Sequence, residues 1–524
     1  MIRKIKFKNY KKFKDNEIFF IEGRNVLVGE NGVGKSTVIE AICMVMRGST
    51  NLVQSKGISN LFNIDAIKKF NIGDKKIEEL PELYVELYFD QNSEANNAEV
   101  CGSHNLDNDK SAFGICMKII PNDDYTLQIK EQLESAEYVF PFEFYKVVFQ
   151  RFDGSSYNTY AKGHTHSYSL LNSSVVSVSS SLNKLITKTY INSTTEGKRK
   201  LIQHDFRSKN DNFSDALYSK YKLEVDAKYK LKIKEAINFA EEFITIHSNG
   251  LDISNLGEGE KLMIAIESNL SQEEKQNTVT LIEEPETHLS YINMEKLICM
   301  IENNANEQII IATHSNMIVS RLGVINTVLL SENGIFHFVD VNEETSKFFQ
   351  KAPNTNLLNF ILSKKCILVE GDAEYILMEK FYEMETGKKL SQDDISIIAC
   401  GGKTFKRYSD IARGLNKRVA IVTDNDKNYD KNITKNYSEI INDNVKVFSD
   451  NNDENWTFEV SLYSYSKTYI DNKLYTKQMG NGVVSFMLNN KAESAFRLLV
   501  ALEDESDQFT IPTYIKEAIA WIKS

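Results

Sequence analysis

The stretch Gly29-Glu30-Asn31-Gly32-Val33-Gly34-Lys35-Ser36-Thr37 decides the fold of the first half of the chain. It fits the pattern G-x-x-x-x-G-K-[ST], in which glycines let backbone N–H groups curve around phosphate oxygens. Residues 26–28 before it are strand-like, and residues 38–46 after it are compatible with a helix. This context predicts a nucleotide phosphate site, with Lys35 on the β- and γ-phosphates and Ser36 on Mg²⁺. The nucleotide-binding residues expected from the loop are Gly29, Asn31, Gly32, Gly34, Lys35, Ser36 and Thr37.

Two later apolar strands end in side chains that suit the same nucleotide site. Residues 278–282 lead into Glu283-Glu284-Pro285-Glu286, and residues 309–312 lead into Thr313-His314-Ser315. We expect Glu283 to hold Mg²⁺ through water and Glu284 to activate the attacking water. His314 would sense the γ-phosphate. An acidic turn and a structural histidine are the plainer alternatives, and the phosphate loop upstream favours the functional reading.

A further glycine-rich segment precedes a helix expected at residues 262–270. Residues 256–261 read Leu-Gly-Glu-Gly-Glu-Lys, and glycines before a helix form an anion-binding N-terminus. The order of these motifs resembles the head domain of ABC-type ATPases of the SMC and RecF kind. In that family, the signature of one head closes over ATP held by another, which implies a homodimer or higher homo-oligomer. The chain departs from the family by having Glu283 for Asp, and Leu256, Gly257 and Glu258 where Ser and Gln are usual; Ser254 is a candidate substitute.

The second half of the chain alternates strands and helices, which predicts a second α/β unit with a largely parallel sheet. One strand ends in Glu370-Gly371 with Glu374 four residues beyond Glu370, and a later strand ends in Asp424-Asn425-Asp426. Parallel strand tips lie along one sheet edge, so we expect these carboxylates to meet there. Their repulsion favours a divalent metal, and oxygen ligands favour Mg²⁺, Mn²⁺ or Ca²⁺. Two such ions about 4 Å apart stabilise both oxygens of an in-line phosphodiester displacement. Solvated loop acids are the alternative.

This acidic segment, with Gly401-Gly402 between its two strands, resembles the Toprim fold of topoisomerases, primases and certain nucleases. An ABC-type head followed by Toprim resembles the OLD (overcoming lysogenization defect) nucleases, whose relatives include the nuclease subunit of the Gabija antiphage system. The resemblance makes Glu370, Asp424 and Asp426 catalytic metal ligands. It also makes Glu459 a further ligand, on an expected acidic strand at residues 456–460. Lys491 matches the late lysine of the family, which stabilises phosphorane charge.

The fold expected is therefore α/β, an ABC/SMC-like P-loop head with a helical dimerisation insert, followed by a Toprim domain. The boundaries expected are 1–153 and 239–355 for the two parts of the head, 154–238 for the insert and 356–524 for Toprim. The insert is Ser-rich at residues 167–181 and has helical spacing at residues 218–239. A surface excursion and a dimerisation or DNA-contact module explain it equally well.

Composition narrows the class of protein. The 524 residues carry 62 Lys and Arg against 73 Asp and Glu, a net charge of −11, which argues against a wholly basic nucleic-acid coat. The six cysteines have no zinc-ligand spacing, and no apolar stretch approaches membrane-spanning length, so we expect a soluble, cytoplasmic protein without a membrane partner. A basic start, from Arg3 to Lys14, and the group Lys403, Lys406 and Arg407 are candidate DNA-phosphate contacts.

These features together predict an ATP-regulated, divalent-metal-dependent DNA endonuclease. ATP with Mg²⁺ would occupy the head, and Mg²⁺, Mn²⁺ or Ca²⁺ the Toprim site. The alternative is a non-catalytic ATP-dependent DNA clamp or repair scaffold of the RecF or SMC type, which leaves the carboxylates of residues 370–426 without a role. The OLD and Gabija resemblance alone implies an antiphage setting and a separately encoded partner such as a helicase.

Overall fold

The computed structural model describes residues 1–90, 100–135, 138–162, 166–172, 175–221, 224–226, 229–230, 240, 243–248, 250–270, 278–304, 308–352, 356–402, 404–474 and 482–524. The chain divides into two compact units. The first consists of Met1–Arg24 and Ser36–Thr313, and the second of Asn25–Lys35 and His314–Ser524. Each unit is described by itself.

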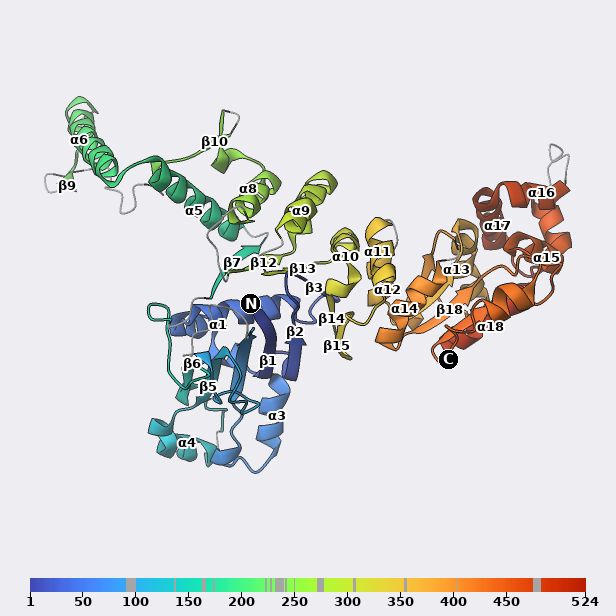
Figure 1. Cartoon of the computed structure of the whole chain (residues 1–524), viewed down its shortest axis with the longest axis horizontal. Helices are drawn as coiled ribbons and strands as arrows, with labels where there is room; N and C mark the ends of the chain where they lie inside the picture. The colour runs from blue at the N-terminus through green and yellow to red at the C-terminus, as the bar shows by residue number, and fades with distance from the viewer. Residues whose placement is uncertain are drawn as a thin grey trace. The chain divides into compact units, whose positions relative to one another are not determined.

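The first unit contains a five-stranded antiparallel sheet, in blue and cyan in Figure 1. Its first strand, Ile2–Tyr10, buries Ile2, Ile5 and Phe7 while lysines alternate with them, which is the period-two pattern of a half-buried strand. The sheet order is β2 (Phe13–Phe19), β1 (Ile2–Tyr10), β4 (Leu83–Phe89), β5 (Gly114–Pro121) and β6 (Tyr145–Arg151). Helices α1 (Lys35–Arg47), α2 (Thr50–Lys56), α3 (Ile64–Ile72) and α4 (Thr126–Leu133) accompany it.

The acidic turn Glu283–Glu286 follows the middle one of three parallel strands of the first unit. Strand β12 (Thr278–Glu283) lies between β13 (Gln308–Ala312) and β7 (Ser167–Asn172). Strands β12 and β13 are runs of the kind that is covered on both faces, whereas β7 is mostly half-buried. Helices α8 (Glu258–Leu270) and α9 (Tyr291–Asn303) bury one face each in this part of the unit.

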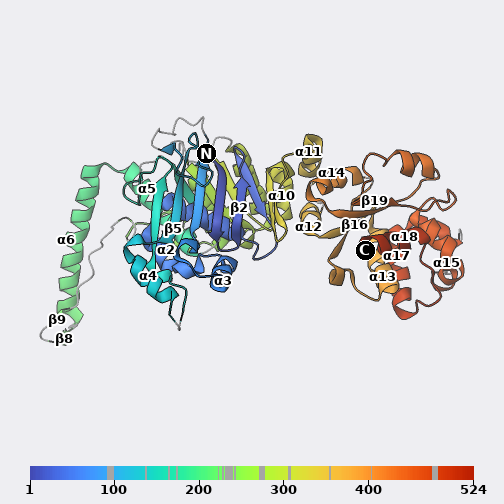
Figure 2. The ribbon, with the colours of Figure 1, turned by 90° about the horizontal axis from the view of Figure 1, so that it is seen from below.

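The segment expected as an insert, residues 154–238, has a mixed structure. Strand β7 falls inside it and pairs in register with β12, so this part is a strand of the same sheet as β12. Helices α5 (Val175–Ser193) and α6 (Glu196–Tyr221) follow, and Figure 2 shows α6 standing apart from the sheets of its unit. The helix expected at residues 218–239 falls mostly outside the described residues. Four short strands complete the unit, β8 (Glu224–Asp226), β9 (Tyr229–Lys230), β10 (His247–Ser248) and β11 (Leu251–Asp252).

The second unit begins with the strand that leads into the phosphate loop. Strand β3 (Arg24–Val28) pairs in parallel with β14 (Thr327–Ser331), which forms a hairpin with β15 (Gly334–His337). Helices α10 (Asn316–Leu322), α11 (Glu343–Lys351) and α12 (Leu357–Leu362) follow around this hairpin. The side chain of Asn316 accepts a 2.9 Å hydrogen bond from the Leu358 N–H, which fixes α10 against the start of α12.

The rest of the second unit is the predicted parallel α/β domain. Its sheet has the order β17 (Ile395–Ala399), β16 (Lys365–Val369), β18 (Arg418–Val422) and β19 (Val445–Phe448), all parallel. Figure 2 shows α14 on one face of the sheet and α13 and α18 on the other. The helices are α13 (Asp372–Thr386), α14 (Phe405–Leu415), α15 (Phe458–Leu474), α16 (Gly482–Asn489), α17 (Lys491–Asp504) and α18 (Thr513–Lys523).

One expected element of this domain is wrong. Residues 456–460 were expected as an acidic strand, whereas α15 begins at Phe458 and Glu459 lies in its first turn. The Thr457 hydroxyl accepts a hydrogen bond from the Val460 N–H at 3.3 Å, which starts the helix. The alternation of Trp456, Phe458 and Val460 looks strand-like over five residues, but the apolar core under the sheet takes Phe458 and Leu462, four residues apart, as a helix face.

All six cysteines are free thiols. None of the described helices is both long and apolar enough to cross a membrane.

A buried glutamine joins the two sheets of the first unit. The Gln308 side chain, at the start of β13, accepts a 2.8 Å hydrogen bond from the Ile2 N–H and donates one of 2.7 Å to the Ile2 carbonyl. Gln308 is 1% exposed, so neither bond can be replaced by water. The amide therefore pairs with β1 as a neighbouring strand would.

We expect Gln308→Leu to destabilise the protein by about 2–4 kcal/mol, because two buried main-chain groups of Ile2 lose their partners. Urea unfolding followed by circular dichroism measures this change. Gln132→Leu, at an exposed position of α4, is the control and should shift stability by about 0.5 kcal/mol or less. Equal effects of the two changes would contradict a structural role for the Gln308 amide.

Candidate functional site

The phosphate loop has the backbone geometry that its glycines allow. Gly29, Gly32 and Gly34 have φ angles of 156°, 78° and 116°. A Cβ on Gly29 would lie 2.3 Å from the Leu330 carbonyl oxygen of β14, so only glycine fits there. Lys35 is buried, and its ammonium donates to the carbonyls of Gly29 and Glu30 at 2.9 and 3.0 Å. The loop therefore closes around this ammonium at the start of α1.

The other loop positions leave groups accessible to a nucleotide. Asn31, Gly32 and Ser36 are exposed, and Thr37 is partly exposed at the N-terminus of α1. Exposed N–H groups and the positive end of a thirteen-residue helix suit a phosphate.

The acidic turn of the first unit follows β12 where its neighbour β13 also ends. Glu283 is in register with Ala312, and the Glu284 N–H donates to the Ala312 carbonyl at 2.8 Å. Glu284 has left-handed backbone angles (φ 45°, ψ 52°), which turn the chain sharply into Pro285. Burial and, after it, the charge of Glu283 raise the pKa of the Cys43 thiol in α1 to about 12, so the β12 tip faces this helix.

The segment after β13 contacts this turn through Thr313. The Thr313 hydroxyl donates to the Glu286 carboxylate at 2.8 Å, and His314, partly exposed, comes next in the chain. A Cβ on Gly259 would lie 2.4 Å from the His288 carbonyl, so the start of α8 packs closely on the same turn. The Ser254 hydroxyl, the candidate substitute in the signature, donates to Asp252 at 2.7 Å.

The acidic edge of the second unit brings the two predicted motifs together. Glu370 follows β16 and Asp424 follows the adjacent β18. The Glu370 carboxylate accepts hydrogen bonds from the Asp424 N–H, at 3.1 Å, and from the Thr423 hydroxyl. Glu374, in the first turn of α13, accepts from the Gly371 N–H at 3.2 Å. The strand tips therefore meet as a parallel sheet requires.

Burial and mutual repulsion hold protons on this cluster. Burial, then the charges of Glu370, Glu374 and Glu459, raise the pKa of Asp424 to about 8. Burial, then Glu459 and Glu370, raise the pKa of Glu374 to about 7. Burial, then the charges of Asp424, Glu374, Asp450 and Glu459, raise the pKa of Tyr514 in α18 far above its ordinary value, which places this ring near the cluster.

Glu459 and Lys491 complete the cluster. Glu459 is 2% exposed, and neither of its carboxylate oxygens has a hydrogen bond in the described part of the chain. The Lys491 ammonium lies 3.1 Å from one of these oxygens, while half of the lysine side chain is exposed. Although burial opposes it, the carboxylates of Glu459, Asp424 and Glu374 raise the pKa of Lys491. This lysine therefore stays charged and faces both the acids and solvent.

Asp426 stands apart from the other acids. It is exposed, has a left-handed φ of 49°, and is tied through its N–H to the Trp456 carbonyl at 3.2 Å. The buried set is thus Glu370, Glu374, Asp424 and Glu459, with Asp426 at its outer rim.

Sequence reasoning missed the residues that hold this loop in place. Asn425 is 1% exposed and donates to the carbonyls of Asp450 and Asn452, at 2.8 and 2.9 Å. The buried Asp450 carboxylate accepts from Ser461 in α15 at 2.8 Å. These residues bind the Asp424 loop to the helix that carries Glu459. No short motif marks them, and an Asn between two Asp residues is the one available signal.

The donor set suits a hard divalent cation. Four carboxylates, two of them with raised pKa values, offer the oxygen ligands that Mg²⁺, Mn²⁺ and Ca²⁺ prefer. Among the described residues, no group of three or more His, Cys, Asp or Glu side chains is already arranged to hold a metal ion. Side-chain rotation within the cluster is therefore required for coordination.

The predicted phosphate contacts beside this edge differ in their surroundings. Arg407 in α14 is paired with Glu344 at 3.2 Å. Lys406 is exposed, and Lys403 lies outside the described residues. At the basic start, Arg3, Lys4, Lys6 and Lys11 are paired with acids of the first unit.

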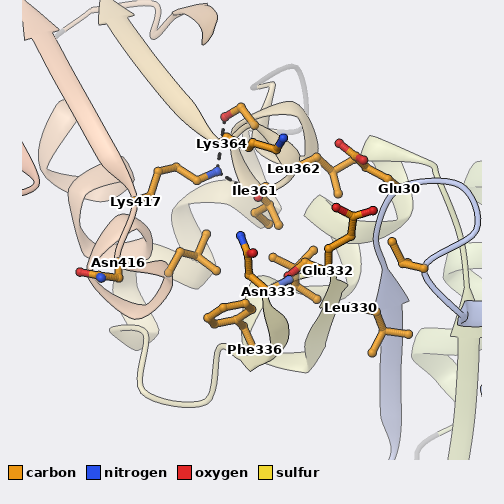
Figure 3. A pocket seen from close by; sticks show the side chains of 15 residues that line it. Glu30, Leu330, Glu332, Asn333, Phe336, Ile361, Leu362, Lys364, Asn416 and Lys417 are labelled. Carbon is orange, nitrogen blue, oxygen red and sulfur yellow. Dashed lines mark hydrogen bonds between the residues drawn. The ribbon is translucent and has the colours of Figure 1, made fainter. Parts of the chain in front are cut away.

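A pocket of about 370 Å³ lies in the second unit, next to the phosphate loop (Figure 3). Glu30 and Glu332 face it from one side and Lys364 from another, above an apolar floor that includes Phe336. Lys417 borders it and donates to the carbonyls at the end of α12 and to Ser363. Burial lowers the pKa of Lys417 to about 8, so its ammonium is charged at neutral pH.

We expect metal binding at the acidic edge to release protons at neutral pH. Asp424 and Glu374 have raised pKa values of about 8 and 7, so they hold protons that a divalent cation must displace. Affinity for Ca²⁺ should therefore rise between pH 6 and 8. Calorimetry in two buffers of different ionisation enthalpy counts the protons. Asp424→Asn should remove most of the release, and a pH-independent affinity would contradict the proton-bearing cluster.

Comparison with known proteins gives two family matches. Residues 1–319 match the AAA ATPase domain model, and residues 361–426 match the model of the TOPRIM domain of overcoming lysogenization defect protein-like sequences. A curated DNA double-strand break repair Rad50 ATPase of Methanopyrus kandleri is 50% identical over 46 residues, which are 9% of this chain and 5% of that protein. The chain thus spans a twentieth of this relative.

Similar solved structures include two of low sequence identity. The C-terminal region of the Xanthomonas campestris pv. campestris OLD protein is 19% identical with a TM-score of 0.24, and the match covers 32% of this chain and 94% of that one. The SMC head domain from Thermotoga maritima is 16% identical with a TM-score of 0.28, covering 64% and 97%. Since the ATPase model covers more than half of the chain, the protein belongs to the AAA ATPase domain family, and residues 361–426 in addition match the OLD-like Toprim model.

Proposed function

We propose that the protein is an ATP-regulated, divalent-metal-dependent DNA endonuclease. The observation that carries this proposal is the buried carboxylate set at the Toprim sheet edge, with the Lys491 ammonium 3.1 Å from Glu459. A purely structural domain would leave these acids destabilising, because buried like charges without a cation repel one another. A clamp of the RecF or SMC type needs no such cluster.

The residues divide the work of phosphodiester hydrolysis among them. Glu370, Glu374, Asp424 and Glu459 would hold the cations, with Asp426 at the rim. When bound, Mg²⁺ or Mn²⁺ supplies charge neutralisation and a water of lowered pKa. The Lys491 ammonium, half exposed, would face the phosphate and stabilise the negative charge that grows on it. Thr423 holds Glu370 by its hydroxyl, which keeps that carboxylate aimed along the strand edge.

The nucleotide would regulate the cut. Phosphodiester hydrolysis is downhill and needs positioning and charge stabilisation, which the Toprim residues provide alone. Gly29, Asn31, Gly32, Gly34, Lys35, Ser36 and Thr37 would hold ATP with Mg²⁺, Glu283 would support the ion, Glu284 would activate water and His314 would sense the γ-phosphate. Closure of two heads over ATP would make the active form a homodimer or higher oligomer. The insert is the proposed dimerisation segment, and an antiphage role with a partner such as a helicase is the proposed setting.

We expect Asp424→Ala to abolish nicking and linearisation of supercoiled plasmid, a loss of about 10³-fold or more, because it removes a central ligand. Lys35→Ala should still cut but should no longer respond to ATP. The assay uses Mg²⁺ or Mn²⁺ with and without ATP. Asp430→Ala, at an exposed acid paired with Lys435, is the control and should cut normally. Intact plasmid in every lane would favour the clamp, and equal loss in both variants would mean obligatory coupling to ATP.

We expect Lys491→Ala to lower the rate of cleavage by about 10²–10³-fold while Ca²⁺ affinity changes little, since the lysine acts on the phosphate. Lys491→Arg should restore part of the rate by keeping the charge. Lys473→Ala, which breaks a 2.9 Å surface ion pair with Glu505, is the matched control. A parallel loss of metal affinity and rate in Lys491→Ala would show that the lysine only supports Glu459.

A further inference from the structure

Trp456 lies at the rim of the Toprim acidic edge. Its carbonyl accepts the Asp426 N–H at 3.2 Å, and it precedes Glu459 by three residues, so its Cα is within about 11 Å of that of the acid. Trp456 is partly exposed. A large aromatic residue thus lies beside the loop that carries Asp424 and Asp426, three residues before Glu459.

A lysine covers this ring. The Lys427 ammonium lies 4.5 Å from the centre of the Trp456 ring. Lys427 is exposed and has a left-handed φ of 67°, which turns it out of the loop that carries Asp424. In the described part of the chain, no carboxylate forms an ion pair with Lys427, and no hydrogen bond involves the indole N–H of Trp456. Both groups therefore have bonding capacity left for a ligand.

We propose that Trp456 and Lys427 form a contact for an unpaired nucleotide of DNA beside the scissile phosphate, with the base stacked on the indole and the ammonium on a phosphate. This rests on the proposed nuclease function and names how its substrate is held. An exposed cation–π contact is weaker than base–aromatic stacking, so the base displaces the lysine from the ring. The freed ammonium then meets a phosphate oxygen. The contact reads the π face of a base, which makes it tolerant of sequence and selective for unstacked strands.

The chain contains its own control for this contact. Trp521, the other of two tryptophans, also carries a cation, with Arg418 4.5 Å from its ring. Arg418 begins β18, whereas Asp424 follows the end of that strand. Trp521 therefore marks the opposite edge of the sheet and should not meet DNA.

The test follows tryptophan emission and DNA binding together in the full-length protein, with EDTA present to prevent cleavage. In Trp521→Phe, where Trp456 is the only tryptophan, a single-stranded oligonucleotide should quench the emission. In Trp456→Phe, the emission of Trp521 should stay unchanged. Trp456→Ala should bind the fluorescein-labelled oligonucleotide about tenfold more weakly by anisotropy, with less change for duplex. In Lys427→Ala, the slope of log binding affinity against log salt concentration should fall by about 1, which corresponds to the loss of one phosphate contact.

Binding by anisotropy with no change in Trp456 emission, and equal affinity in Trp456→Ala, would overturn the stacking contact and leave the nuclease proposal standing. Failure of the unaltered protein to bind or cut any DNA would overturn the proposed function and this inference with it. Because the Asp426–Trp456 hydrogen bond is made by the main chain, Trp456→Ala keeps it. Ca²⁺ affinity equal to that of the unaltered protein in Trp456→Ala would separate loss of the base contact from a shifted loop.

Discussion

Repulsion among buried carboxylates is the constraint that organises the second half of this protein. Glu370, Glu374, Asp424 and Glu459 converge from two strand tips and two helix starts. The pKa values of Asp424 and Glu374 rise, and the buried Glu459 carboxylate lies 3.1 Å from the Lys491 ammonium. Such a cluster costs stability unless protons, Lys491 or divalent cations offset it. The hydrogen bonds of the surrounding polar residues hold the acids close together despite their repulsion.

That network explains why the loop after β18 is so heavily bonded. Asn425 is fixed by two carbonyls, Asp450 by Ser461 and Asn455, and Glu370 by Thr423. A fully bonded polar network in a low-dielectric interior is rigid, which keeps ligands within the narrow geometry that chemistry requires. The first half of the chain is packed as closely at Gly29 and Gly259. A Cβ added at either position would lie 2.3 or 2.4 Å from a backbone carbonyl oxygen, so only glycine fits there.

Much of both sites was predictable because local chemistry dominates there. The phosphate loop must combine glycines, Lys35 and Ser36 in one continuous segment, so nine residues carry the whole signal. The parallel strands at β16, β17 and β18 are short apolar runs with acidic or glycine-rich ends, and their tips must share an edge. The prediction for residues 456–460 was wrong, because alternation over five residues also fits a strand. The helix is recognised only from the burial of Phe458 and Leu462, which are four residues apart.

The sequence by itself determined the order of the motifs and the succession of an ATPase domain and an OLD-like Toprim segment. It also singled out Glu370, Asp424 and Lys491 as candidate site residues. Tertiary structure decided which acids are buried together: Glu459 joins the cluster and Asp426 lies at its rim. It also decided the tie between Gln308 and Ile2, and the meeting of Lys427 with Trp456. Those outcomes depend on packing between segments far apart in the sequence. Lys427 and Trp456 are 29 residues apart, and Ile2 and Gln308 are 306 residues apart. Local propensity carries no information about such distances, because burial is a property of the assembled core.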